Sequence, residues 1–128
     1  MAKARQNLEA AEAEHQAGRN DASASRSYYA AFHTAIAALI RAGIRPSGSG
    51  FPRWGHDFVR SQFEGHLVYR RHQYGTEFRR ALSDLLRLRI DADYNPVPVR
   101  PRDAAQALRI ARALVQAVEE SMGEGDSR

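Results

Sequence analysis

The segment with the most chemical potential is residues 86–96, LRLRIDADYNP, where a leucine-rich helix runs into an Asn-Pro stop. Its polar side chains include Arg89, Asp91, Asp93 and Tyr94. Arg89 offers a planar fork of N–H donors suited to phosphate, and Asp93, four residues on, can pair with it on one helix face. Carboxylates at a helix C-terminus oppose the helix dipole, and such local conflicts tend to mark functional sites. We therefore predict that Asp91 and Asp93 bind a ligand beside Arg89; the alternative is that both acids are solvated and only balance the arginines.

A second set of polar residues lies on the helix predicted over residues 22–42. Arg26, Tyr29 and His33 are spaced so that they project from nearly one face of that helix. This spacing predicts a polar seam that holds a ligand. The alternative is a histidine at the edge of the core, hydrogen-bonded to a neighbour, as is usual for a lone histidine on an apolar face.

A basic loop is the third candidate. Arg70, Arg71 and His72 lie between Tyr69 and Tyr74. Guanidinium groups bind phosphates and aromatic rings stack on bases, so this mixture suits a single-stranded nucleic acid. We predict Arg70, Arg71 and Tyr74 as nucleic-acid-binding residues; the alternative is an ordinary exposed loop.

Several classes of site have no support in the sequence. There is no Gly-rich phosphate loop and no H-E-x-x-H, G-x-S-x-G or C-x-x-C motif, and the chain has no cysteine. No two of the five histidines have the i,i+4 spacing, and Asp91 and Asp93 alone are too few ligands to indicate magnesium. We therefore expect neither a metal nor a cofactor.

The composition indicates one basic domain. The chain has 128 residues, a formal net charge of +4 and a pI of about 10.0. Its basic residues are almost all arginine, which favours a phosphate-binding surface, although a GC-rich genome would produce the same bias. With no cysteine, no signal peptide and no apolar run long enough for a membrane span, we expect a cytoplasmic protein.

The spacing of apolar residues predicts five helices and no strand. They are expected over residues 3–17, 22–42 and about 56–69, between Thr76 and the Asn-Pro stop, and from Asp103 onward. The residues expected to end or cap these helices are Gly18, Asn20 or Asp21, Gly43, Thr76 and Asp103. Short connections between amphipathic helices predict an all-α fold, an up-and-down bundle of four to five helices. We expect one domain over 1–122 and a disordered tail over 123–128.

Two stretches together resemble the HEPN domains. SRSYYAAFHTAIAALIRAG at 25–43 resembles their tyrosine-pair helix, and LLRLRIDADYNP at 85–96 resembles their helix that ends in an Arg motif. The resemblance implies a helical bundle that commonly dimerises. Many members are RNA-cleaving toxins or defence effectors, often encoded with a nucleotidyltransferase antitoxin. In the RNase members, an Arg and a His four to six residues later act at a shared cleft without a metal.

Arg89 matches the arginine of this motif, whereas Tyr94 occupies the position of the histidine, so that the pair of catalytic residues becomes Arg89 and Tyr94. A phenol is a poor general base at neutral pH. The resemblance therefore implies a homodimer that binds RNA or a nucleotide in a toxin–antitoxin or defence module, without standard RNase activity. Two alternatives stay open. One is an active metal-independent RNase toxin that uses Arg89 with Tyr94 or with a histidine such as His33 or His56. The other is a non-catalytic helical interaction subunit.

Overall fold

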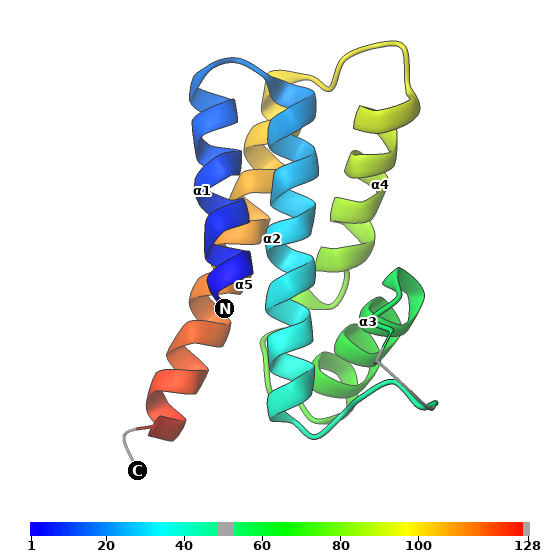
Figure 1. Cartoon of the computed structure of the whole chain (residues 1–128), viewed down its shortest axis with the longest axis vertical. Coiled ribbons are helices and arrows are strands. Elements are labelled where there is room, and N and C mark those ends of the chain that lie inside the picture. Colours follow the sequence, from blue (N-terminus) through cyan, green and yellow to red (C-terminus); the bar gives the residue numbers. More distant parts are fainter. Residues whose placement is uncertain (49–52, 127–128) are drawn as a thin grey trace.

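The computed structural model describes residues 1–48 and 53–126, and every regular element in these ranges is helical (Figure 1). The α-helices are α1 (Ala2–Gln16), α2 (Asn20–Arg41), α3 (His56–Gln62), α4 (Ala81–Tyr94) and α5 (Pro101–Asp126). A π-helical segment, η1 (Phe63–Arg70), continues α3, and a 3₁₀ turn, η2 (Thr76–Phe78), precedes α4. The predicted all-α bundle of four to five helices is confirmed.

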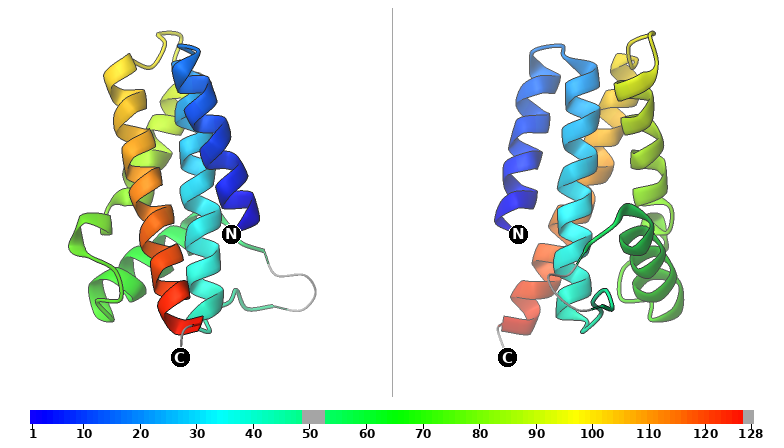
Figure 2. Two further views of the ribbon diagram at one scale, coloured as in Figure 1. Left: turned by 90° about the vertical axis from the view of Figure 1, so that its left-hand side faces the viewer. Right: turned by 45° about the vertical axis from the view of Figure 1, so that its right-hand side comes forward.

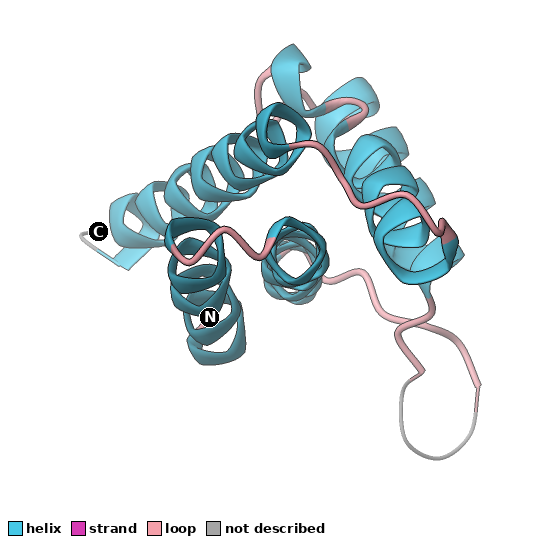
Figure 3. Ribbon diagram, turned by 90° about the horizontal axis from the view of Figure 1, so that it is seen from above, coloured by secondary structure: helices cyan, strands magenta, loops and turns pink. Residues whose placement is uncertain are grey.

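Helix α2 is the centre of the bundle. It contacts α1, α3, α4 and α5. Seen from above, α2 stands between α1 and α5 on one side and α4 on the other (Figure 3). The sequence of α2 explains this position, because its small side chains let neighbouring helices approach closely on several sides. Its fully buried alanines are Ala24, Ala30, Ala31, Ala35 and Ala38. The larger Tyr28 and Leu39 of α2 belong to the main core, which α2 shares with η1 and α4.

The core has two principal parts. The first joins α2 to η1, α4 and α5 through large buried side chains that include Phe63, Leu67, Leu82, Leu85, Leu114 and Val118. The second packs α1 against α2 and α5 through Leu8, Ala11, Ala30, Leu108, Ala111 and Val115. In the left view of Figure 2, α1 and α5 both run along α2. Burial of these side chains against α2 supplies the main driving force for assembling the bundle.

Two glycines end the first two helices as predicted. Gly18 has a φ of 78° and Gly43 a φ of 80°, in the left-handed region that favours glycine. The predicted cap of α2 is wrong, since no capping side-chain hydrogen bond is formed at its start. Asp21 instead accepts a hydrogen bond from the backbone N–H of Val99 at 2.8 Å. This carboxylate therefore attaches the loop before α5 to the start of α2.

The start of α4 is capped by a residue that the sequence did not indicate. Thr76 belongs to the separate turn η2 and makes no capping hydrogen bond, so its predicted role is wrong. The carboxylate of Glu64 accepts hydrogen bonds from the backbone N–H of Ser83 at 3.0 Å and from its hydroxyl at 2.8 Å. A carboxylate in the first turn of a helix satisfies a free N–H and complements the helix dipole. Tertiary packing of η1 against α4 thus replaces the local cap.

Helix α5 begins at Pro101, before the predicted start at Asp103, because proline suits the first helical position. Asp103 lies in the first turn, where its Oδ2 is 3.3 Å from Arg100 Nε. The helix continues to Asp126, so residues 123–126 are helical where we expected a tail. Residues 127–128 lie outside the described residues, and the domain boundary at 122 stays a prediction. No helix in the described ranges combines the length and apolar character needed to cross a membrane.

Candidate functional site

Arg89 lies on the side of α4 that packs against α2, and its side chain is 22% exposed. Its guanidinium carbon is 5.3 Å from the centre of the Tyr29 ring on α2, within the range of a cation–π contact. Arg89 Nε is 3.1 Å from Asp93 Oδ2, and Asp93 Oδ1 accepts a hydrogen bond from Ser25 Oγ at 3.2 Å. We refer to Ser25, Tyr29, Arg89 and Asp93 as the Arg89 cluster. It holds one guanidinium in a defined position between α2 and α4.

The Arg89 guanidinium retains unused donor capacity. The Nε–H is not directed at Asp93 despite the short distance, and this buried atom has no hydrogen-bond acceptor among the described residues. Buried N–H groups without a partner are uncommon in proteins. A guanidinium has five N–H donors, and the carboxylate of Asp93 does not use them all. The remaining donors suit an anion such as phosphate, which a planar guanidinium can bind with two parallel hydrogen bonds.

A tyrosine–histidine pair lies beside the Arg89 cluster. The rings of Tyr28 and Tyr29 are 5.4 Å apart, and the Tyr28 hydroxyl is hydrogen-bonded to Nδ1 of His56, the first residue of α3. Both rings of the pair pack on Phe32, with centroid distances of 5.8 Å from Tyr28 and 4.9 Å from His56. Burial raises the pKa of Tyr28 above its ordinary value, and the positive charge of Arg89 acts in the opposite direction. The hydroxyl therefore stays protonated at neutral pH and can orient the histidine.

The structure divides the predicted seam on α2. Tyr29 belongs to the Arg89 cluster, but Arg26 donates from Nη1 to Asn7 Oδ1 on α1 at 3.3 Å. His33 also lies near the start of α1. Burial lowers its pKa, and the positive charges of Lys3 and of the N-terminal amino group act in the same direction. The structure therefore does not bring the three residues together, because Arg26 and His33 lie toward α1 whereas Tyr29 contacts Arg89 on α4. A ligand-binding role for Arg26 and His33 stays a prediction.

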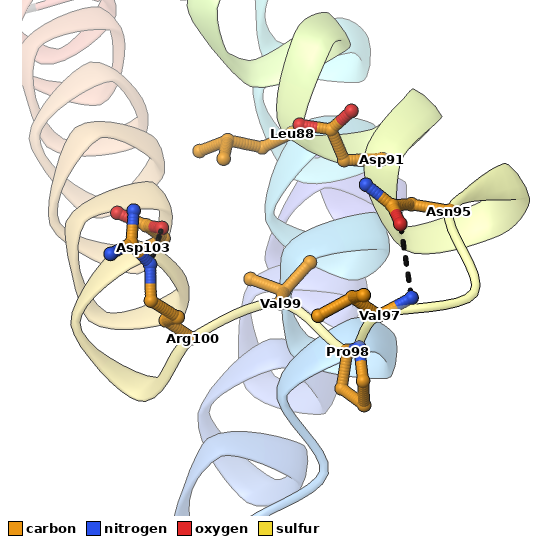
Figure 4. A pocket seen from close by; sticks show the side chains of 8 residues that line it. All are labelled: Leu88, Asp91, Asn95, Val97, Pro98, Val99, Arg100 and Asp103. Atoms are coloured by element: carbon orange, nitrogen blue, oxygen red, sulfur yellow. Dashed lines mark hydrogen bonds and ion pairs between the residues drawn. The ribbon is translucent and has the colours of Figure 1, made fainter.

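Asp91 and Tyr94 project away from the Arg89 cluster. Two residues on an α-helix are about 200° apart, so Asp91 lies on a different side of α4 from Asp93. Asp91 lines a pocket of about 220 Å³ between the end of α4 and the start of α5, with Leu88, Asn95, Val97, Pro98, Val99, Arg100 and Asp103 (Figure 4). Tyr94 is 77% exposed and lies about 140° around the helix from Arg89. Within one chain, neither side chain joins Arg89.

The predicted nucleic-acid-binding residues are also separated. Arg70 is exposed at the end of η1, whereas Arg71 donates from Nη1 to the carbonyl oxygen of Ala42 at 3.5 Å. Tyr74 is 6% exposed, and its ring stacks on Phe63 with centroids 5.6 Å apart. Burial raises the pKa of its hydroxyl. A base cannot stack on a ring inside the core, so the prediction for Tyr74 is wrong: burial of its apolar ring outweighs its position in a polar loop.

Sequence reasoning did not select Ser25, Tyr28 or Arg60 as site residues, and it named His56 only within an alternative. The available signal was the i,i+4 spacing of His56 and Arg60, which places both on one face of a helix. Nothing local indicated that this face lies near Tyr28. In residues 1–48 and 53–126, no three His, Cys, Asp or Glu side chains are grouped as metal ligands.

A comparison with protein families shows which family the chain resembles. The family model of the HEPN domain matches residues 1–121, nearly the whole chain. The chain belongs to the HEPN family. HEPN domains commonly dimerise and are associated with RNA-related or toxin-like functions. No curated protein matches the chain. In this HEPN domain, α2 supplies the tyrosine pair and α4 supplies Arg89, and the two helices pack directly against each other.

Proposed function

We propose that this HEPN protein binds RNA or a nucleotide through the Arg89 cluster, without standard RNase activity, in a toxin–antitoxin or defence module. It acts as a cytoplasmic homodimer, and its partners are RNA and a nucleotidyltransferase antitoxin. The observation that carries the proposal is the Arg89 guanidinium, which Tyr29 and Asp93 hold in place while some of its donors stay unused. A guanidinium that is already positioned loses little conformational freedom when it binds a phosphate.

The residue five positions after Arg89 argues against standard RNase activity. Attack of a ribose 2′-OH on the adjacent phosphate requires a group that accepts the hydroxyl proton and another that protonates the leaving oxygen. Tyr94 stands in that position, and a phenol is a poor base at neutral pH. Arg89 alone can stabilise charge on a phosphate but cannot transfer its proton. Binding without cleavage is the function that these two residues support.

A second candidate function is metal-independent RNA cleavage in which His56 replaces the missing histidine. The observation in its favour is the hydrogen bond from Tyr28, which holds the His56 ring next to the Arg89 cluster. An imidazole that is oriented through one nitrogen can transfer a proton through the other. His33 is a weaker choice, because it lies on the side of α2 that faces the start of α1.

The first experiment tests binding and cleavage together. The purified protein is incubated with a mixed RNA pool in the absence of metal, beside the variants Arg89→Ala and Arg80→Ala. Arg80, which immediately precedes α4, is a comparable control, because it forms an i,i+4 pair with Asp84 at 3.8 Å and is 70% exposed. We expect intact RNA in every sample and salt-sensitive binding that falls about tenfold in Arg89→Ala alone, as for the loss of a charged hydrogen bond.

Other outcomes would favour the alternatives. Cleavage by the unmodified protein that disappears in Arg89→Ala would overturn the proposal and establish an RNase; loss of cleavage in His56→Asn would then identify the proton-transfer group. Intact RNA without binding in any sample would instead favour a helical interaction subunit. In that case Arg89→Ala would lower stability and dimerisation, because the pair of Arg89 with Asp93 would serve only to order the end of α4.

A further inference from the structure

A second guanidinium lies near the Tyr28 hydroxyl. Arg60 is on α3, one turn after His56, and its Nη2 donates to Asp57 Oδ1 at 3.2 Å. Its Nε is buried and, like that of Arg89, has no hydrogen-bond acceptor among the described residues. His56, one turn before Arg60, is bonded to the Tyr28 hydroxyl, and Arg89 packs on the ring of Tyr29, which is 5.4 Å from that of Tyr28. Two cations from two different helices, each with a buried donor not used within the described chain, therefore flank the tyrosine pair.

His56 adds a donor that points away from Tyr28. Among the described residues, His56 Nδ1 is the hydrogen-bond partner of the Tyr28 hydroxyl, so the buried hydroxyl donates its proton there. Because Nδ1 accepts this bond, the ring proton of the neutral imidazole lies on Nε2. Contact with Phe32, at a centroid distance of 4.9 Å, restricts the ring. Tyr28 thus acts as a positioning residue that leaves Nε2–H for another partner.

The carboxylates near these groups do not account for both arginines. Asp57 pairs with Arg60 but is 93% exposed, and Asp93 pairs with Arg89 while accepting a hydrogen bond from Ser25. Neither carboxylate is paired with both guanidinium groups. Like charges repel, and a buried N–H without an acceptor costs free energy. An anion between the two arginines would remove both costs at once.

We propose that Arg60, Arg89 and Nε2 of His56 form one site for a phosphate group of RNA or a nucleotide, with Tyr28 orienting His56. The inference rests on the proposed binding function and adds to it the residues of α3. The three groups are suited to phosphate because two guanidinium forks and one N–H match its several acceptor oxygens. A singly charged carboxylate ligand would use fewer of these donors.

The space next to this site suits one nucleotide. A groove of about 290 Å³ begins at Arg60 and is lined on α4 by Leu86 and Ile90, the latter 45% exposed, together with Ser83, Arg87 and Asp91. This volume is close to the lower limit of the range for ligand pockets, which is about 300 Å³. An apolar surface beside a phosphate site would receive the base or ribose attached to that phosphate. The ligand class is therefore a single nucleotide unit, free or within an RNA strand.

The test measures binding of a labelled single-stranded RNA whose riboses are 2′-O-methylated, so that attack by a 2′-OH cannot occur. Fluorescence anisotropy compares the unmodified protein with Arg60→Ala, Arg89→Ala, the double variant and the control Arg80→Ala. We expect each single variant at the site to bind about tenfold more weakly, as for loss of a charged hydrogen bond. Because both arginines would hold one phosphate, the double variant should lose clearly less than the hundredfold that independent contacts would produce.

His56 provides an independent readout. Replacement by leucine removes the Nε2–H donor and should weaken RNA binding several-fold, whereas His56→Gln retains an N–H donor and should weaken it less. Equal losses of RNA affinity in the two variants would show that His56 donates no hydrogen bond to the phosphate. Circular dichroism spectra and thermal midpoints show whether each variant is folded. Arg60→Ala is a mild change in this respect, since the Arg60 side chain is 40% exposed.

The possible results separate the shared site from the proposed function. Loss of binding in Arg89→Ala but not in Arg60→Ala overturns the shared site and leaves binding through the Arg89 cluster intact. A hundredfold loss in the double variant shows two separate contacts and also overturns the shared site. No binding by the unmodified protein, or equal binding by all variants, overturns both proposals.

Discussion

Replacing Asp93 with asparagine is expected to lower stability slightly while it strengthens RNA binding. Asparagine keeps the shape of the side chain and an oxygen that can accept the hydrogen bond from Ser25, so the main change is loss of a charge. The pair with Arg89 joins side chains that are 22% and 35% exposed, and such a pair contributes about 0.5–1 kcal/mol. Removing the negative charge also stabilises the helix by about 0.3 kcal/mol, because a carboxylate at the C-terminal end opposes the helix dipole. We expect the free energy of unfolding to fall by about 0.5 kcal/mol.

The expected gain in affinity comes from the same charge. Asp93 competes with a bound phosphate for the Arg89 guanidinium and repels it. A unit charge about 5 Å from the phosphate, in a largely aqueous dielectric, changes the binding free energy by about 1 kcal/mol. The RNA dissociation constant of Asp93→Asn should therefore fall about fivefold. Stability and affinity move in opposite directions only if Arg89 binds a ligand.

Urea unfolding and RNA anisotropy at pH 7 measure the two quantities on the same preparations. Asp84→Asn is the control, since Asp84, in the first turn of α4, forms an i,i+4 pair with Arg80 at 3.8 Å. We expect the control to change RNA affinity by less than about twofold, as for a distant, screened charge. If Asp93→Asn weakens RNA binding as much as Arg89→Ala does, the reasoning is refuted, because the negative charge of Asp93, and not only the shape that asparagine keeps, would then be required to hold Arg89 in place. Equal gains in both asparagine variants would indicate a non-specific effect of net charge.

Two further predictions concern stability. Tyr28→Phe removes the hydroxyl bonded to His56 and should lower the free energy of unfolding by about 1 kcal/mol in urea titrations; an unchanged value would contradict that hydrogen bond. His33 should make stability depend on pH, because burial lowers its pKa in the folded chain and the unfolded chain therefore binds the proton more readily. The stability that neutral His33 contributes is fully present above the unfolded pKa of about 6.5. It is lost as the pH falls from that value towards the lower pKa of the folded chain. His33→Gln should remove that dependence, whereas His72→Gln, at an exposed position, should keep it; identical pH profiles for all three proteins would count against this assignment.

The helices could be predicted because their signals are local. The apolar spacing and the alanines of α2 and the glycines at positions 18 and 43 act within a few residues along the chain. The side-chain partners at the starts of the helices could not be predicted, because they come from distant parts of the chain. Glu64 caps α4 and Asp21 binds Val99, and both partners are distant in the sequence. A carboxylate finds whichever N–H the packed helices bring near it, so composition around a helix start is an incomplete guide.

In the candidate site, too, some features follow from the local sequence and others only from tertiary packing. The sequence by itself determined that Arg89 and Asp93 share one face of α4, because four residues complete slightly more than one helical turn. The same period already separates Asp91 from both. Arg26, Tyr29 and His33 lie within about 60° of one another around α2, so periodicity alone grouped them. Only packing could place Tyr29 against α4 and the other two toward α1.

The tertiary structure alone decided which chemistry surrounds Arg89. Residues 42–55 join α2 to α3, and a connection of this length does not by itself fix where the next helix packs. Burial of Val59 and Phe63 against the core selects the position, and this brings His56 and Arg60 near Tyr28. Hydrophobic burial is non-directional, so the position at which α3 packs depends on all the apolar surfaces of the bundle. No single segment of the sequence determines that position.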